Sequence, residues 1–243
     1  MSSRRIYREE HEGARLTSFS VKVKETDLWI AVDKNARTDE LPGKVEQLVW
    51  RLRKQLEEYL GDNPRLASSF SPVLLNDNAP EIARVMSIQA NRAGVGMMAA
   101  VAGAFAEAVG HLLLEYSSEV VVENGGDLYI KTEHPLKVGI YAGNSPLNGK
   151  LALQVAPEKT PLGVCTSSGT VGPSRSFGKA DAAVALSPSV PLADAAATAL
   201  GNMVKTEEDL QKALVYADQL EGITGALLIY NDKAAAWGDI HFV

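Results

Sequence analysis

Residues 191–200 of this chain are Pro191-Leu192-Ala193-Asp194-Ala195-Ala196-Ala197-Thr198-Ala199-Leu200, a stretch that predicts the opening of a helix. Asp194 and Thr198 are four residues apart, so their side-chain oxygens stack on one face of that helix. A carboxylate and a hydroxyl placed in this way can share a hard cation such as Mg2+. A second interpretation needs no metal, because an acid in a first turn favours the helix dipole and a threonine can fill an alanine-rich interface.

A loop of small residues precedes this helix and begins with Cys165-Thr166-Ser167-Ser168-Gly169-Thr170. A glycine loop rich in hydroxyls beside a helix start can hold an anion, because backbone N–H groups there point outward without partners. We therefore expect Ser167, Ser168, Gly169 and Thr170 to contact a phosphate or a ribose. A strand end followed by a solvated polar loop explains the same pattern equally well.

Farther upstream, Asn124-Gly125-Gly126-Asp127 lies between two runs typical of β-strands, residues 120–122 and 128–130. Two adjacent glycines are ideal for a hairpin turn, and that is the favoured interpretation for the turn alone. The functional alternative is a nest of backbone N–H groups that lets a nucleotide approach closely.

Composition restricts the class of partner. The 243 residues include 24 basic and 30 acidic side chains, a net charge of −6, which argues against nucleic acid or an anionic membrane as the main partner. A single cysteine excludes an internal disulfide and a cysteine-cluster zinc site. The N-terminus lacks the apolar segment of a secretory signal, and the apolar stretch at 94–114 carries Glu107 and His111, as in a buried core helix. We expect a cytoplasmic protein.

Strand-like and helix-like segments are mixed along the chain without a repeating βα pattern. This favours an α+β fold with a mainly antiparallel sheet flanked by helices, in one domain over residues 1–243. The sequence shows no internal repeat. We expect strands at 16–24, 27–32, 119–123, 127–131, 137–141, 151–155, 163–166, 182–186, 225–230 and 234–237, and helices at 42–60, 80–90, 96–116, 191–203 and 206–220.

Other reactive side chains have simpler explanations. Cys165 has no sequence-level partner among the four histidines, which favours a buried structural thiol over a nucleophile. Glu107 and His111, four residues apart, are better explained as a partly exposed pair than as a catalytic dyad. A Cys165-dependent sulfur or acyl carrier is the weakest of the functional hypotheses.

In the order of these motifs, residues 95–203 resemble the ApbE superfamily, whose best-known members are FAD:protein FMN transferases. A small-residue helix is followed by Asn-Gly-Gly-Asp, a Thr-Ser-Ser-Gly loop and Ala193–Ala199, which is similar to the family's Ala-Asp-Ala-x-x-Thr-Ala. The resemblance implies an α+β fold related to tandem T-folds, with Asp194 and Thr198 holding Mg2+ beside the FAD pyrophosphate. It also implies that Gly125, Gly126, Ser168 and Gly169 line the flavin nucleotide.

The chain departs from the transferases at two places. Ala102-Gly103 stands where they carry Lys-Gly, with Glu107 in place of the usual Asp, and a His-Ile-Ile-Asp-Pro-like segment is missing before the metal helix. These differences indicate a separate branch of the superfamily.

The leading hypothesis is a protein that binds a flavin nucleotide or related diphosphate with Mg2+, and that cleaves it or transfers from it. The alternative is a non-catalytic partner or carrier that has lost FMN transfer. The oligomeric state and any acceptor protein are left open.

Overall fold

The architecture follows from two long antiparallel hairpin systems joined edge to edge in one sheet. A computed structural model describes residues 15–168 and 177–243. Eight strands form the main sheet in the order β1-β2-β3-β4-β7-β8-β9-β10, and every neighbouring pair is antiparallel. The strands are β1 (Leu16–Val23), β2 (Thr26–Asp33), β3 (Val120–Asn124), β4 (Asp127–Lys131), β7 (Leu162–Ser167), β8 (Ala182–Ser187), β9 (Gly225–Tyr230) and β10 (Lys233–Gly238).

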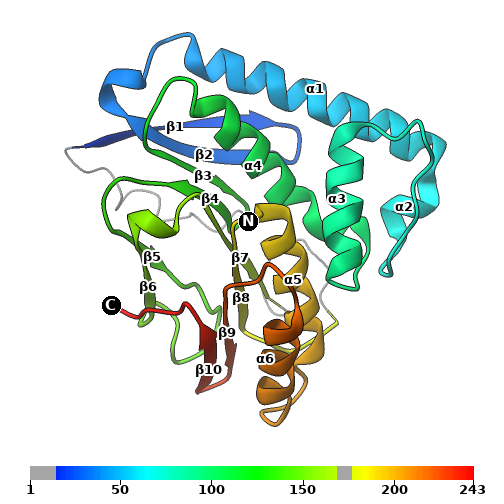
Figure 1. Cartoon of the computed structure of the whole chain (residues 1–243), viewed down its shortest axis with the longest axis vertical. Helices are drawn as coiled ribbons and strands as arrows, with labels where there is room; N and C mark the ends of the chain where they lie inside the picture. The colour runs from blue at the N-terminus through cyan, green and yellow to red at the C-terminus, as the bar shows by residue number, and fades with distance from the viewer. Residues whose placement is uncertain (1–14, 169–176) are drawn as a thin grey trace.

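Helices cover one face of this sheet, and a small two-stranded sheet covers the other (Figure 1). The helices are α1 (Leu41–Asp62), α2 (Pro64–Ser68), α3 (Glu81–Arg92), α4 (Val101–Leu113), α5 (Val190–Met203) and α6 (Asp209–Gln219), with 3-10 turns η2 (Lys34–Ala36), η3 (Met97–Ala100) and η4 (Pro157–Lys159). The small sheet pairs β5 (Leu136–Gly139) with β6 (Ala152–Val155).

Alternation along the strands divides the core into two clusters. On β2, Leu28, Ile30 and Val32 face the helices, whereas Trp29 and Ala31 face the small sheet. This period of two is what a sheet buried on both faces requires. The expected α+β class with a mainly antiparallel sheet flanked by helices is therefore confirmed.

The sheet consists of two halves with the same topology, in agreement with the implied relation to tandem T-folds, although the sequence shows no internal repeat. In the first half, helices connect β2 to β3, and the strand order is β1-β2-β3-β4. In the second half, α5 and α6 connect β8 to β9, and the order is β7-β8-β9-β10. The two halves share their topology but not their sequence. Each half can bury its strands with its own alternating pattern of apolar residues, so the residues themselves need not repeat. The halves meet where β4 pairs with β7.

Three smaller differences from the expected elements concern chain ends and connections. The first hairpin turns at Lys24-Glu25, because Val23 pairs with Thr26, one residue earlier than expected. Residues 64–68 form α2 within a segment expected to be a loop. The helix expected at 96–116 is divided into η3 and α4.

No single described helix has both the length and the apolar character to cross a bilayer; α3 and the segment 97–113 meet that measure only as a pair bent by 103°.

Candidate functional site

The candidate site lies at the junction of the two halves of the sheet, beneath α4 and α5. The β3–β4 hairpin turns at Gly125 and Gly126, whose φ angles are +74° and +123°. Both values favour glycine, and Asn124 pairs with Asp127 across the turn. The hairpin interpretation is thus confirmed, while nucleotide binding by the two glycines stays a prediction.

The side chains at the two ends of this turn point to the helices. Asn124 donates a hydrogen bond from Nδ2 to the carbonyl oxygen of Ala102, at 3.1 Å. Asp127 is buried, and its carboxylate lies against the Cys165 thiol and the Thr166 backbone of the adjoining strand. The turn is therefore attached both to the start of α4 and to β7.

Asp194 lies above the same junction. Its Oδ2 accepts a hydrogen bond from the backbone nitrogen of Gly103, at 2.8 Å, and the side chain is only 9% exposed. α5 begins at Val190, so Asp194 is beyond its first turn. The interpretation of Asp194 as a first-turn acid for its own helix is wrong, because its carboxylate satisfies the N-terminal amides of α4 instead.

Glu107 makes the reciprocal contact. Its Oε1 accepts a hydrogen bond from the backbone nitrogen of Val190, the first residue of α5, at 2.9 Å. Each helix therefore supplies a carboxylate to the N-terminus of the other, and the two helices run antiparallel. The expectation of a partly exposed pair with His111 did not include this role of Glu107. Glu107 follows Gly103 by four residues and so shares its face of the helix, but this spacing does not identify Val190 as the partner.

The paired helices can approach closely because residue 103 is glycine. A Cβ there would lie 2.6 Å from the carbonyl oxygen of Val190 and 2.9 Å from Cβ of Asp194. Val190 also accepts a contact of 3.5 Å from Sγ of Cys165. Cys165 is fully buried, as expected for a structural thiol.

Burial and mutual repulsion perturb the acids of this site. Burial raises the pKa of Asp127 to about 7, and the nearby charge of Glu123 adds to the effect. Burial also raises the pKa of Asp194 well above its ordinary range, and the charge of Asp127 raises it further. The amides of Ala102 and Gly103 oppose this shift only in part. The pKa of the Cys165 thiol is raised by burial and then by both carboxylates.

This donor set fits a divalent cation. Oδ1 of Asp127 is buried and has no hydrogen-bond partner among the described residues. The two carboxylates repel each other, and one of them has an oxygen without a hydrogen-bond partner. A positive charge placed between them would lower the electrostatic free energy of the pair. Within residues 15–168 and 177–243, no three His, Cys, Asp or Glu side chains form a metal cage. A cation held here would need oxygens from a ligand as well, which is the usual condition for Mg2+.

The remaining predicted residues have different positions. Ser167 lies beneath α5, with Oγ 3.7 Å from the place that a Cβ on Gly201 would occupy. Thr198 and Ser168 are half-buried, and Thr198 follows Asp194 by one turn of α5. Gly169 and Thr170 lie outside the described residues. The structure thus brings the Asn124–Asp127 turn, Ser167 and α5 together at one junction.

An aromatic pair at the far end of α5 was not predicted. The rings of Phe70 and Phe177 meet edge to face, with centroids 4.8 Å apart, and both side chains are more than half exposed. The backbone nitrogen of Phe177 donates to Oδ1 of Asn202, at 2.8 Å. Asn202 lies eight positions after Asp194, a little over two turns farther along α5. No sequence signal joins positions 70 and 177, because only the tertiary fold brings them together.

Comparison with known proteins identifies the family of this chain. The family described as AbpE bacteria matches residues 8–231. The UPF0280 protein of Methanococcus vannielii is 39% identical over 230 residues, which cover 93% of this chain and 92% of that protein. The UPF0280 protein of Methanocella arvoryzae is 44% identical over 191 residues, 78% of each chain.

Two solved structures share the fold at low sequence identity. The Pseudomonas stutzeri flavinyl transferase ApbE, in its apo form, matches with a TM-score of 0.58 and 15% identity, over 92% of this chain and 94% of that one. The flavin transferase ApbE from Vibrio cholerae matches with a TM-score of 0.56 and 15% identity, over 93% and 98%. On these matches, the chain is a member of the AbpE bacterial family and has the ApbE fold, in the branch that contains the UPF0280 proteins.

Proposed function

We propose that this protein binds a flavin dinucleotide, or a related nucleotide diphosphate, together with Mg2+ at the junction of its two halves. The observation that supports this most directly is the buried pair Asp127 and Asp194, with the unpartnered Oδ1 of Asp127. Asp194 and Thr198 hold the cation in this proposal, and Asp127 adds a second carboxylate. The name of the structural neighbours, flavin transferases, suggests the nucleotide.

The length of α5 suits an extended ligand. Eight residues separate Asp194 from Asn202, which corresponds to roughly 12 Å along a helix. The cation end lies at Asp194, and the exposed rings of Phe70 and Phe177 lie beyond Asn202. We assign the pyrophosphate to the first end and a planar ring to the second, because aromatic side chains offer large apolar contact surfaces.

Each protein group has a separate task in this proposal. A cation held by Asp194 and Thr198 would neutralise charge on the pyrophosphate, which would assist its cleavage. Ser167 and Ser168, with Gly169 and Thr170, supply hydroxyl and amide donors to the ribose, because Ser167 lies beside Gly201, seven positions along α5 from Asp194. The Gly125-Gly126 turn lets the nucleotide approach the backbone closely.

A second candidate is a carrier that binds the nucleotide without transferring FMN. Ala102 stands where the transferases carry a lysine, and its backbone is already committed, with its carbonyl bonded to Asn124. No charged side chain is available from that position. This candidate keeps the Mg2+-dependent affinity and predicts that neither FMN nor AMP forms.

Calorimetric titration of FAD, with Mg2+ or with chelator, tests binding in the wild type and in Asp194→Asn. We expect Mg2+ to strengthen binding to the wild type at least tenfold and to have little effect on the variant. Asp209→Asn is the matched control, because Asp209 also accepts hydrogen bonds from backbone nitrogens, those of Lys205 and Thr206, but lies on α6. Equal affinity in every combination would refute the proposal. Chromatography of FAD incubated with the protein and Mg2+ separates cleavage from simple binding.

A further inference from the structure

Two adjoining depressions lie on the surface between α1, the end of α4 and the segment after β2. Their volumes are about 530 and 430 Å3, and both are wide open to solvent. Tyr116 lines both, so we name them together the Tyr116 groove. The first is lined by Arg15, Asp33, Lys34, Asn35, Ala36 and Tyr116, and the second by Lys44, Gln47, Leu48, Arg51, Leu112 and Tyr116.

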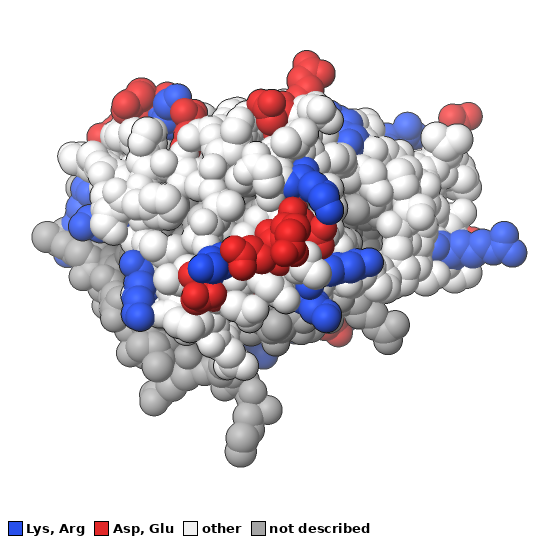
Figure 2. All heavy atoms as spheres, turned by 90° about the horizontal axis from the view of Figure 1, so that it is seen from below, with Lys and Arg blue, Asp and Glu red and all other residues white. Residues whose placement is uncertain are grey.

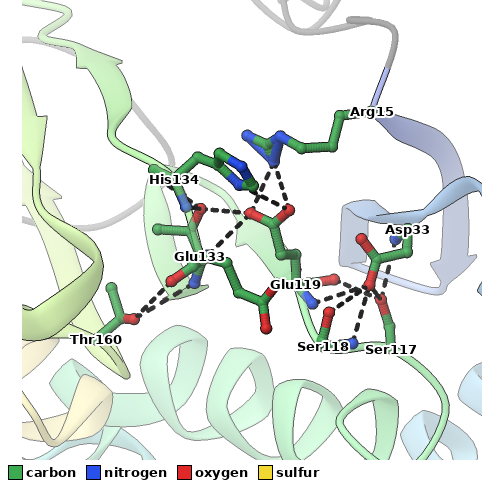
Figure 3. A network of polar contacts seen from close by, with 9 residues as sticks. Arg15, Asp33, Ser117, Ser118, Glu119, Glu133, His134 and Thr160 are labelled. Atoms are coloured by element: carbon green, nitrogen blue, oxygen red, sulfur yellow. Dashed lines mark hydrogen bonds and ion pairs between the residues drawn. The ribbon is translucent and has the colours of Figure 1, made fainter.

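The charges of this groove are mostly positive, although the chain as a whole carries −6. Arg15 is committed to the buried Glu119, with Nη1 2.8 and 2.7 Å from the two carboxylate oxygens. Asp33 is the one acid among the described residues that line the groove. Its Oδ2 accepts hydrogen bonds from both Ser118 donors, from the Ser117 hydroxyl and from the Glu119 nitrogen (Figure 3).

The remaining cations are Lys34, Lys44 and Arg51, and all three are exposed. Among the residues that the structure describes, none of the three forms an ion pair with a carboxylate. With Arg15 counted, four cations face the two acids Asp33 and Glu119, a local balance of +2. On the side of α6 and β10, by contrast, acidic side chains gather in a central patch (Figure 2). The groove is therefore a cationic region of an acidic protein.

An aromatic and apolar surface lies among these cations. The Tyr116 ring is 40% exposed, and Nζ of Lys44 lies 5.3 Å from its centroid. Leu48 and Leu112 are half-buried in the floor of the second depression. Lysine and arginine bind phosphate oxygens, and tyrosine contacts planar rings. This combination suits a small molecule that carries both a phosphate and an aromatic ring.

The groove is separate from the site at the junction of the two halves. Gly103, near the start of α4, contacts Asp194, whereas Leu112, near the end of α4, lines the groove. Nine residues of helix separate them, roughly 14 Å. We propose that the Tyr116 groove binds an aromatic phosphate monoester of nucleoside monophosphate size, with Lys44 and Arg51 on the phosphate and Tyr116 on the ring.

Calorimetric titration of AMP tests this proposal, with chelator present so that a Mg2+-dependent site does not contribute. We expect saturable binding that is tighter than binding of inorganic phosphate or adenosine. Lys44→Gln and Arg51→Gln should each weaken it about tenfold, since each removes a charge-assisted hydrogen bond. Tyr116→Leu keeps apolar bulk and should weaken it about threefold.

Lys54→Gln is the matched control. Lys54 is an exposed lysine of α1, the helix that also carries Lys44 and Arg51, but it pairs with Glu58 at 3.8 Å and does not line the groove. It should leave AMP affinity within twofold of the wild type. All four substitutions are at or near the surface, and urea unfolding checks that each variant is folded. Absence of saturable AMP binding, or a loss in Lys54→Gln equal to that in Lys44→Gln, would overturn the proposal.

Discussion

Oδ2 of Asp194 and the backbone nitrogen of Gly103, 2.8 Å apart, join α5 to the N-terminus of α4. Glu107 and Val190 make the opposite connection, at 2.9 Å. Two buried helix ends, which otherwise leave amides without partners, are thus satisfied by carboxylates from the facing helix. The same contacts hold Asp194 over the sheet junction, so the stability of this helix pair and the geometry of the proposed cation site depend on each other.

Gly103→Ala should separate the two helices. The added Cβ would meet the carbonyl oxygen of Val190 at 2.6 Å, a contact that neither backbone can easily avoid. We expect a loss of about 1–3 kcal/mol in the free energy of unfolding, measured by urea denaturation. Gly43→Ala on α1 is the control, because no atom of the described residues lies within 4 Å of the position that a Cβ on Gly43 would occupy. Alanine there should be neutral or stabilising, and an equal loss in both variants would contradict the packing argument.

Glu107→Ala leaves the Val190 amide without its acceptor. The expected cost is about 1–3 kcal/mol in the free energy of unfolding, the usual penalty for an unsatisfied buried donor. Glu107→Gln keeps a carbonyl oxygen of similar shape and should cost less. Urea denaturation of both variants at neutral pH makes the comparison. Equal losses would show that the carboxylate acts through its charge and not as an acceptor.

Stability should fall as pH rises, because of the buried acids. The pKa of Asp127 is raised to about 7 in the folded protein, whereas an unfolded aspartate has a pKa of about 4. The folded state thus binds the proton more tightly. This stabilisation is complete below about pH 4 and is lost as pH rises through about 7, by at most about 1.4 kcal/mol per pH unit. Asp127→Asn removes this pH-dependent stabilisation. With chelator present, the free energy of unfolding of the variant should therefore rise relative to that of the wild type between pH 5 and pH 8. Parallel stability curves would contradict this assignment.

Mg2+-dependent binding of FAD should strengthen between pH 6 and pH 8. A cation requires the carboxylates of Asp127 and Asp194 in their charged form, and burial holds both pKa values above the ordinary range. Binding should therefore release protons. Calorimetry in buffers of different ionisation enthalpy measures that release directly. Binding heats that are independent of the buffer would mean that these acids are not ligands.

Cys165 should react slowly with a thiol reagent in the native protein. The side chain is fully buried, and burial next to two carboxylates raises its pKa, so little thiolate forms at neutral pH. Reaction should become fast in urea concentrations that unfold the chain. Rapid native modification, with loss of nucleotide binding, would instead favour a carrier role for this thiol.

Local sequence was sufficient for most of the elements. Alternation predicted β1 and β2, and adjacent glycines predicted the turn between β3 and β4, because both signals depend on neighbouring residues. The order of motifs also indicated the fold family and placed Asp194 on a helix. α2 was not predicted, because its five residues are too few to show a helical period of apolar side chains.

Tertiary structure alone decided what these residues contact. Spacing indicated that Asp194 shares a face with Thr198, but not that its carboxylate caps α4 or lies near Asp127, 67 positions earlier in the chain. The pairing of Phe70 with Phe177 was absent from the sequence pattern, and the twofold topology was implied only by the resemblance to the family. Periodicity records which face of an element is buried, whereas the partner on that face is set by how distant elements pack. The buried acids, and the chemistry proposed for them, arise from that packing.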